Sequence, residues 1–156
     1  MADLTISEAI FKLTKLEAAI EDVLKHEVLD EAKKAIVDSA KRNVYDAYTP
    51  EFYSRRNGLG GILDPTEIQY DVNATELVAW QAADWQQLYG GQKPEISLAE
   101  AIASGSKRFY FQNAGPRPFH AQAEKYLIQS GKAREALRRG LMRKGYITDD
   151  GFFSLI

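Results

Sequence analysis

A single apolar stripe constrains this chain more than any other feature of its sequence. From Thr5 onward, apolar side chains recur every three or four residues, the spacing that places them on one face of a helix. Thr5 and Glu8 have the spacing of a capping box, so we expect the helix to begin there. The stripe comprises Ile6, Ile10, Leu13, Leu16 or Glu17, Ile20, Leu24, Val28, Ala32, Ile36, Ala40 and Val44.

Such a helix is long for a small domain. If it ran to Asp46 it would measure about 60 Å, at about 1.5 Å per residue. We therefore expect a bend or break within residues 26–30, giving two consecutive helices. Pro50 ends the pattern, because proline donates no backbone hydrogen bond and disfavours helix in the residue before it. The sequence thus predicts an N-terminal helical segment over residues 1–48.

The stretch that follows the helical segment has the composition of an exposed, mobile loop. Residues 53–65 hold three glycines and two adjacent arginines. We expect this Arg/Gly-rich loop to be presented outward as an interaction element. Its candidate contact residues are Arg55, Arg56, Gly58 and Leu59.

Residues 49–156 have the pattern of a mixed body of strands and helices. Two alternating stretches joined by residues 73–75 predict an antiparallel hairpin. Ser97 and Glu100 predict the start of a short helix that Gly105 closes. The fold class is therefore α+β, with a small antiparallel sheet packed against the N-terminal helix and a C-terminal helix in one domain overall. The other expected elements are a third strand at 108–111, a helix from 118 to 145, and a strand, turn and strand over 146–156.

Composition excludes several classes of protein. The 20 basic and 22 acidic side chains give a net charge of −2, so the chain as a whole has no attraction to nucleic acid. It has no cysteine, which excludes disulfide frameworks, thiolate zinc sites and cysteine nucleophiles. No apolar run approaches the roughly 20 residues of a membrane helix, and we see no signal peptide. We expect a protein that is soluble and intracellular when made.

Charge is distributed unevenly. Residues 1–51 carry 7 basic and 11 acidic side chains, whereas residues 117–156 carry 8 and 4, so the two ends attract one another. The basic side chains near the C-terminal end of the last helix offset its dipole, and we expect them to pair with the acidic helix of the same or a neighbouring subunit. The alternative is a face for DNA or another partner. Its candidate residues are Lys132, Arg138, Arg139 and Arg143.

No catalytic constellation accompanies these features. The two histidines, His26 and His120, lack the further ligands that a metal site needs, and there is no Gly-x-Ser-x-Gly elbow. The plain interpretation of His120 is a surface or half-buried helix residue. Gly58 to Gly61 does not join a strand to a helix, as a phosphate-binding loop does. We expect no enzyme, no metal and no cofactor.

The end of the chain is unusually apolar. Four of its last five residues are large and apolar, and these need a surface to cover them. Docking within the subunit and docking on a neighbouring subunit both remain open. The residues are Phe152, Phe153, Leu155 and Ile156.

Three short motifs, in order, resemble those of the tail-completion or neck proteins of long-tailed bacteriophages. Arg-Arg-x-Gly-Leu-x-x-x-Leu-Asp spans 55–64, Leu-Ala-x-x-Ile-x-x-Gly-Ser spans 98–106, and Arg-Pro-Phe opens the last helix. The resemblance covers about residues 40–146. Leu98 and Ala103 depart from the tyrosine and the acidic residue that are usual in that family. The matching positions are Leu98, Ala99, Ile102, Gly105, Ser106, Arg117, Pro118 and Phe119.

The resemblance implies a small α+β fold and a structural role in the virion, at the junction of head and tail. It implies no reaction. The partners it implies are further copies of the chain in a ring, other connector or tail proteins, and DNA passing through the channel. The chain would be made in the cytoplasm of the bacterial host. The alternative from the residues is a nucleic-acid-binding regulator that uses the basic C-terminal helix.

Overall fold

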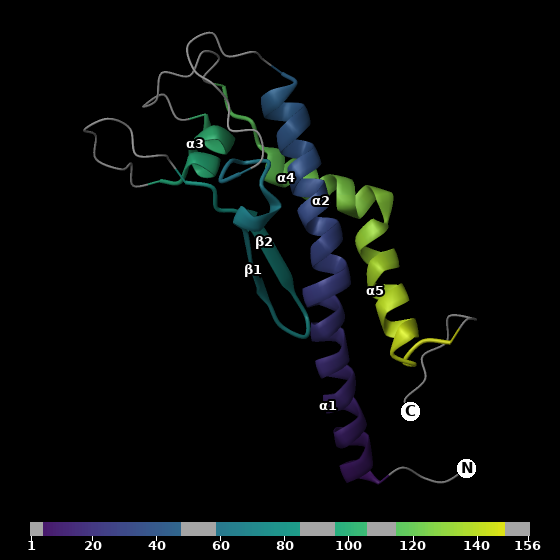
Figure 1. The fold of residues 1–156 in the computed structure, drawn as a ribbon. Coiled ribbons are helices and arrows are strands. Elements are labelled where there is room, and N and C mark those ends of the chain that lie inside the picture. The colour runs from purple at the N-terminus through teal and green to yellow at the C-terminus, as the bar shows by residue number, and fades with distance from the viewer. Residues whose placement is uncertain (1–4, 48–58, 85–95, 106–114, 149–156) are drawn as a thin grey trace. The chain divides into compact units, whose positions relative to one another are not determined.

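The computed structural model describes residues 5–47, 59–84, 96–105 and 115–148 (Figure 1). It has a long N-terminal helix, a two-stranded antiparallel sheet and C-terminal helices, which confirms the α+β class. The chain forms two compact units. Unit 1 contains Met1–Glu31, Asp71–Val78 and Gly131–Ile156, and unit 2 contains Ala32–Tyr70 and Ala79–Ser130.

The N-terminal helix begins where the sequence predicts. Helix α1 spans Ile6–Val23, and α2 spans Leu29–Ala40. At the start of α1, the Thr5 hydroxyl accepts the Glu8 N–H at 3.3 Å, and the Glu8 carboxylate accepts the Thr5 N–H at 2.8 Å. Both halves of the predicted capping box are therefore present.

Between α1 and α2 the backbone remains helical. Leu24–Val28 forms a π-helical turn, and a second π-helical turn, Lys41–Tyr45, follows α2. A π-helical turn holds one residue more than an α-helical turn, so it rotates the apolar positions that come after it without ending the helix. The sequence has neither glycine nor proline between residues 6 and 46. The bend or break predicted within residues 26–30 therefore lies close to its predicted place. It takes the form of a change in hydrogen-bond spacing, and the helix does not break.

Unit 1 is built around a close approach of two helices. Helix α5, Lys132–Arg143, runs antiparallel to α1 (Figure 1). A Cβ atom on Gly140 would lie only 2.3 Å from Cγ1 of Val23, so glycine is what allows the helices to come this near. The buried residues of this cluster are Ala19, Val23, Val28, Ala136 and Leu141.

Unit 2 has its own core, centred on Phe119. Phe119 is completely buried at the start of α4, Phe119–Ser130. The other buried members come from α2 and the π-helical turn after it, from the sheet and the segments on either side of it, from α3, Leu98–Ser104, and from α4 itself. They are Ala35, Ile36, Ala40, Val44, Ile62, Ile68, Ala83, Ala99 and Ala123.

The predicted hairpin and short helix are confirmed. Strands β1, Ile68–Val72, and β2, Leu77–Gln81, form the sheet. Asn73 closes the turn between them, since its N–H donates to the Glu76 carbonyl at 2.9 Å. Ser97 accepts the Glu100 N–H at 3.1 Å at the start of α3, and Gly105 ends that helix with φ at +70°.

The single C-terminal helix predicted from residue 118 to 145 is wrong. The structure has two helices, α4 and α5, separated by Gly131 in a left-handed conformation, φ +67°. The C-terminal end of α5, at Gly145, is as predicted. The Gly145 N–H donates to the Met142 carbonyl, and the Tyr146 N–H to the Leu141 carbonyl, both at 2.9 Å. These two bonds form a Schellman motif with glycine at the usual left-handed position.

The predicted exposed loop over 53–65 is wrong in its second half. Residues 53–58 lie outside the described residues, as do the predicted strand at 108–111 and residues 149–156 of the strand, turn and strand predicted over 146–156. Ile62 and Asp64 are buried, although Leu59 is exposed. The Asp64 carboxylate accepts the Gly60 N–H at 2.7 Å and the Thr66 hydroxyl at 2.6 Å. The segment is packed because Ile62 contributes to the core of unit 2.

Candidate interaction surfaces

The residues that carry the family resemblance form the framework of unit 2. Ala99 and Phe119 are buried in its core, and Leu98 and Ile102 pack against that core. The Arg117 N–H donates to the Ile102 carbonyl at 3.3 Å and to the Ala103 carbonyl at 3.2 Å. These bonds join the end of α3 to the start of α4. Gly105 terminates α3, Pro118 is exposed, and Ser106 lies outside the described residues.

A buried amide fastens the end of the sheet to the segment before it. Gln81, the last residue of β2, donates from Nε2 to the Ile62 and Asp64 carbonyls, each at 3.0 Å. Its Oε1 accepts the Ala83 N–H at 3.0 Å. Hydrogen bonds from Thr66 and Gly60 lower the pKa of the nearby Asp64 carboxyl. Sequence reasoning missed Gln81, because a glutamine at a strand end gives no signal of burial.

His120 belongs to this same polar network. Its Nε2 accepts the backbone N–H of Gln81 at 3.0 Å, and its ring lies 4.1 Å from that of Phe119. Burial lowers the pKa of His120, which favours the neutral ring that this acceptor role requires. His120 is half-buried in α4, in agreement with the prediction of a surface or half-buried helix residue. In the described ranges, no group of three or more His, Asp or Glu residues is placed to hold a metal ion.

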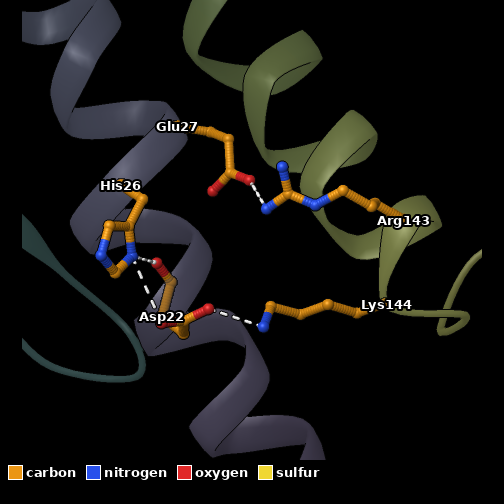
Figure 2. A network of polar contacts seen from close by, with 5 residues as sticks. All are labelled: Asp22, His26, Glu27, Arg143 and Lys144. Atoms are coloured by element: carbon orange, nitrogen blue, oxygen red, sulfur yellow. Dashed lines mark hydrogen bonds and ion pairs between the residues drawn. The ribbon is translucent and has the colours of Figure 1, made fainter.

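The acidic and basic ends of the chain meet inside unit 1. Arg143 pairs with Glu27, and Lys144 Nζ lies 2.6 Å from Asp22 Oδ2 (Figure 2). The Lys144 hydrogen bond lowers the pKa of Asp22, and attraction to Lys144, His26 and Arg143 adds to this shift. Pairing between the basic helix and the acidic helix is therefore confirmed within one copy. Lys132, Arg138 and Arg139 are exposed elsewhere on α5.

The first turns of α1 present an apolar face that the described residues of unit 1 leave uncovered. Ile6, Ile10 and Leu13 are 81%, 59% and 51% exposed, and we call these three residues the open stripe. Further along the same predicted stripe, Ile20 and Leu24 pack against the unit 1 core. Isolated exposed apolar residues are ordinary, but several on one helix face mark a contact site. The open stripe is the strongest candidate surface in the described parts of the chain.

The other predicted contact residues have different outcomes. Leu59 is highly exposed, as the interaction loop requires. Arg55, Arg56 and Gly58 lie outside the described residues, and so do the four apolar residues at the end of the chain, Phe152, Phe153, Leu155 and Ile156.

Comparison with known proteins gives one family. The family described as YomN matches residues 12–143, which is most of the chain. No curated protein and no solved structure matches. Among the helices that the structure describes, none is long and apolar enough to cross a membrane.

Proposed function

The chain belongs to the YomN family, which is phage-derived and of the Bacillus SPbeta type, and on this premise we propose a structural protein of the virion. Its place is the head-tail junction, where it acts in the neck or in tail completion and performs no reaction. The observation that carries the proposal is the open stripe, because a folded chain with an uncovered helix face is suited to assembly.

The motif resemblance gives this proposal its particular location. The matching residues cooperate physically, since Phe119, Ala99 and the Arg117 backbone bonds build one framework. Motif residues that pack together support membership of a structural family better than the same residues dispersed over a surface. The head-tail junction is the role that the resemblance implies for a chain of this framework.

Assembly in a ring gives each exposed feature a partner. A ring is built from a heterologous contact, in which one surface of each copy meets a different surface of the next. In this proposal the loop residues Arg55, Arg56, Gly58 and Leu59 and the apolar end of the chain contact neighbouring copies or other connector and tail proteins. Arg138 and Arg139 face DNA or a partner.

The alternative, a nucleic-acid-binding regulator, has less support. Arg143 and Lys144 pair with Glu27 and Asp22, so two cations of the basic helix are engaged within the chain. A regulator of this kind would bind DNA with an affinity that falls steeply as salt is added. Absence of DNA binding at low ionic strength would exclude the regulator.

Deletion of the gene from an inducible phage genome tests the proposed role. The expected product is DNA-filled heads and finished tails that fail to join, with joining restored by a plasmid copy. Complementation with Ile10→Ser restores joining poorly, whereas Phe11→Ser, a change at 60% exposure on another side of the same helix, restores it fully. Normal joined particles without the gene would contradict the proposal, and so would a defect confined to DNA packaging.

A further inference from the structure

The outward side of α5 carries a dense group of basic side chains. The helix contains five basic residues and a single acidic one, Glu135. Figure 2 shows Arg143 and Lys144 directed at α1, where both form ion pairs. The other four cations of α5 are exposed, and we call them the outer basic face. They are Lys132, Arg134, Arg138 and Arg139.

The described residues do not neutralise this face. Arg134, Arg138 and Arg139 form no ion pair with another described residue. Glu135 lies among the four cations and leaves a net charge of +3. Arg134 and Arg138 are four residues apart, and like charges at this spacing destabilise a helix. The same spacing separates Arg139 from Arg143. An anion bound along the face would remove this repulsion.

We propose that the outer basic face binds the phosphate backbone of double-stranded DNA. Arginine donates to phosphate oxygens through two parallel hydrogen bonds. Lys132 and Arg139 lie about 10 Å apart along the helix axis, at about 1.5 Å per residue. Charges on each strand of a duplex recur about every 3.4 Å along its axis, so the face can meet several phosphates. This inference rests on the proposed function, which leaves DNA and a protein partner open for Arg138 and Arg139.

The composition of α5 favours duplex DNA over other partners. The core of a protein–protein contact is more apolar than the rest of the surface and rich in aromatic residues, whereas contacts with DNA are polar and strongly positive. Single-stranded nucleic acid is held by aromatic side chains that stack on its bases. Helix α5 has no aromatic residue, and each of its exposed positions is charged. Contacts to phosphate carry no sequence information, so we expect binding without sequence preference.

Fluorescence anisotropy with the full-length chain and a labelled duplex of mixed sequence tests the inference. We expect the logarithm of the affinity to fall against the logarithm of the salt concentration with a slope of about −3 to −4, as three or four phosphate contacts require. Arg138→Gln combined with Arg139→Gln should lower the affinity at low salt at least about tenfold and reduce the slope by about 2.

Two matched variants control for charge alone. Lys15→Gln combined with Lys25→Gln changes the net charge equally, at exposed positions of the N-terminal helical segment, and should bind the duplex as the unaltered chain does. Arg138→Lys combined with Arg139→Lys keeps the charge and should keep most of the slope.

A gain of binding gives a readout that loss of folding cannot imitate. Glu135→Gln removes the acidic side chain from the outer basic face. Because a carboxylate repels phosphate, we expect the affinity for the duplex to rise about threefold or more at low salt. An unchanged affinity would mean that DNA does not lie along this face.

Absence of duplex binding at low salt, an equal loss in the glutamine variant of α5 and in its lysine control, or a preference for single-stranded DNA would overturn the inference. A glutamine variant of α5 that binds DNA normally but fails to join heads to tails would also overturn it, because the face would then bind a protein. The binding assay does not depend on the virion. A chain that binds DNA but is dispensable for joining contradicts the junction role alone, and a chain required for joining that binds no DNA contradicts this inference alone.

Discussion

The two units of this chain bury their apolar residues in different ways. In unit 2 a completely buried phenylalanine is surrounded by aliphatic side chains, and the polar groups beside it are hydrogen-bonded. In unit 1 a glycine lets two helices approach, ion pairs flank the crossing, and the apolar face of α1 continues beyond its cover. Unit 2 is therefore a framework, whereas unit 1 has apolar surface left on which partners can bind.

Truncation of the unit 2 core has the largest expected effect. Phe119→Ala removes a fully buried ring and leaves a cavity, so we expect a loss of about 3–5 kcal/mol in the free energy of unfolding. Ile128→Ala on the same helix is the control, because Ile128 is exposed and its loss should stay within about 0.5 kcal/mol. Urea unfolding followed by circular dichroism measures both. Similar losses for the two variants would mean that Phe119 is not the centre of this core.

The helix crossing of unit 1 is expected to be the next most sensitive point. Gly140→Ala places a methyl group 2.3 Å from Val23 Cγ1, and we expect overpacking to cost about 1–3 kcal/mol, less the gain in helix propensity. Adding Val23→Ala makes room for that methyl group. The double variant should therefore be more stable than the sum of the two single losses predicts, in a double-mutant cycle. Simple additivity would show that the helices do not meet at Gly140.

His120 makes the stability of unit 2 dependent on pH. Its pKa is lowered by burial, so the unfolded chain takes up a proton first as the pH falls below about 6.5. The contribution of neutral His120 to the free energy of unfolding is therefore fully present above that pH. It declines as the pH falls toward the folded-state pKa, by at most about 1.4 kcal/mol per pH unit. His120→Gln keeps an acceptor near the Gln81 N–H and should flatten this slope. An unchanged slope in the variant would assign it to another group.

The ion pair of Asp22 should have the smallest effect. Its pKa is lowered chiefly by the Lys144 hydrogen bond, so its contribution is present above a pH of about 3.9 and is lost as the pH falls through the lowered value. Both partners are partly exposed, and salt screens such a pair. Asp22→Asn should lower the urea midpoint slightly at low salt and not at high salt. Asp30→Asn, at an exposed position of α2, is the control.

Local chemistry could be predicted from the sequence where it is decided within a few residues. The Thr5 capping box, the Asn73 turn and the glycine after α5 follow from short-range hydrogen bonding, and all three are confirmed. The attraction between the acidic and basic ends was also predictable from charge alone, as the Lys144 to Asp22 pair illustrates.

Features decided by distant packing were not predictable in this way. Gln81 is buried because other segments fold over it, although glutamine is usually exposed, and Ile62 is buried within a stretch whose glycines and arginines indicate an exposed loop. The π-helical turns arise from a choice between two hydrogen-bond spacings that the same residues allow. Gly131 within an otherwise helical stretch is compatible with a continuous helix or with two, and the structure has two.

The distribution of this chain among phage particles shows whether it belongs to the virion. Particles from an induced culture are separated on a density gradient, and each fraction is analysed by quantitative mass spectrometry. We predict that the chain travels with DNA-filled, tailed particles at a constant ratio of a few copies to each portal. Its absence from those fractions, with the protein recovered only in the soluble fraction, would contradict a place in the virion and bring the salt-dependent DNA-binding test forward.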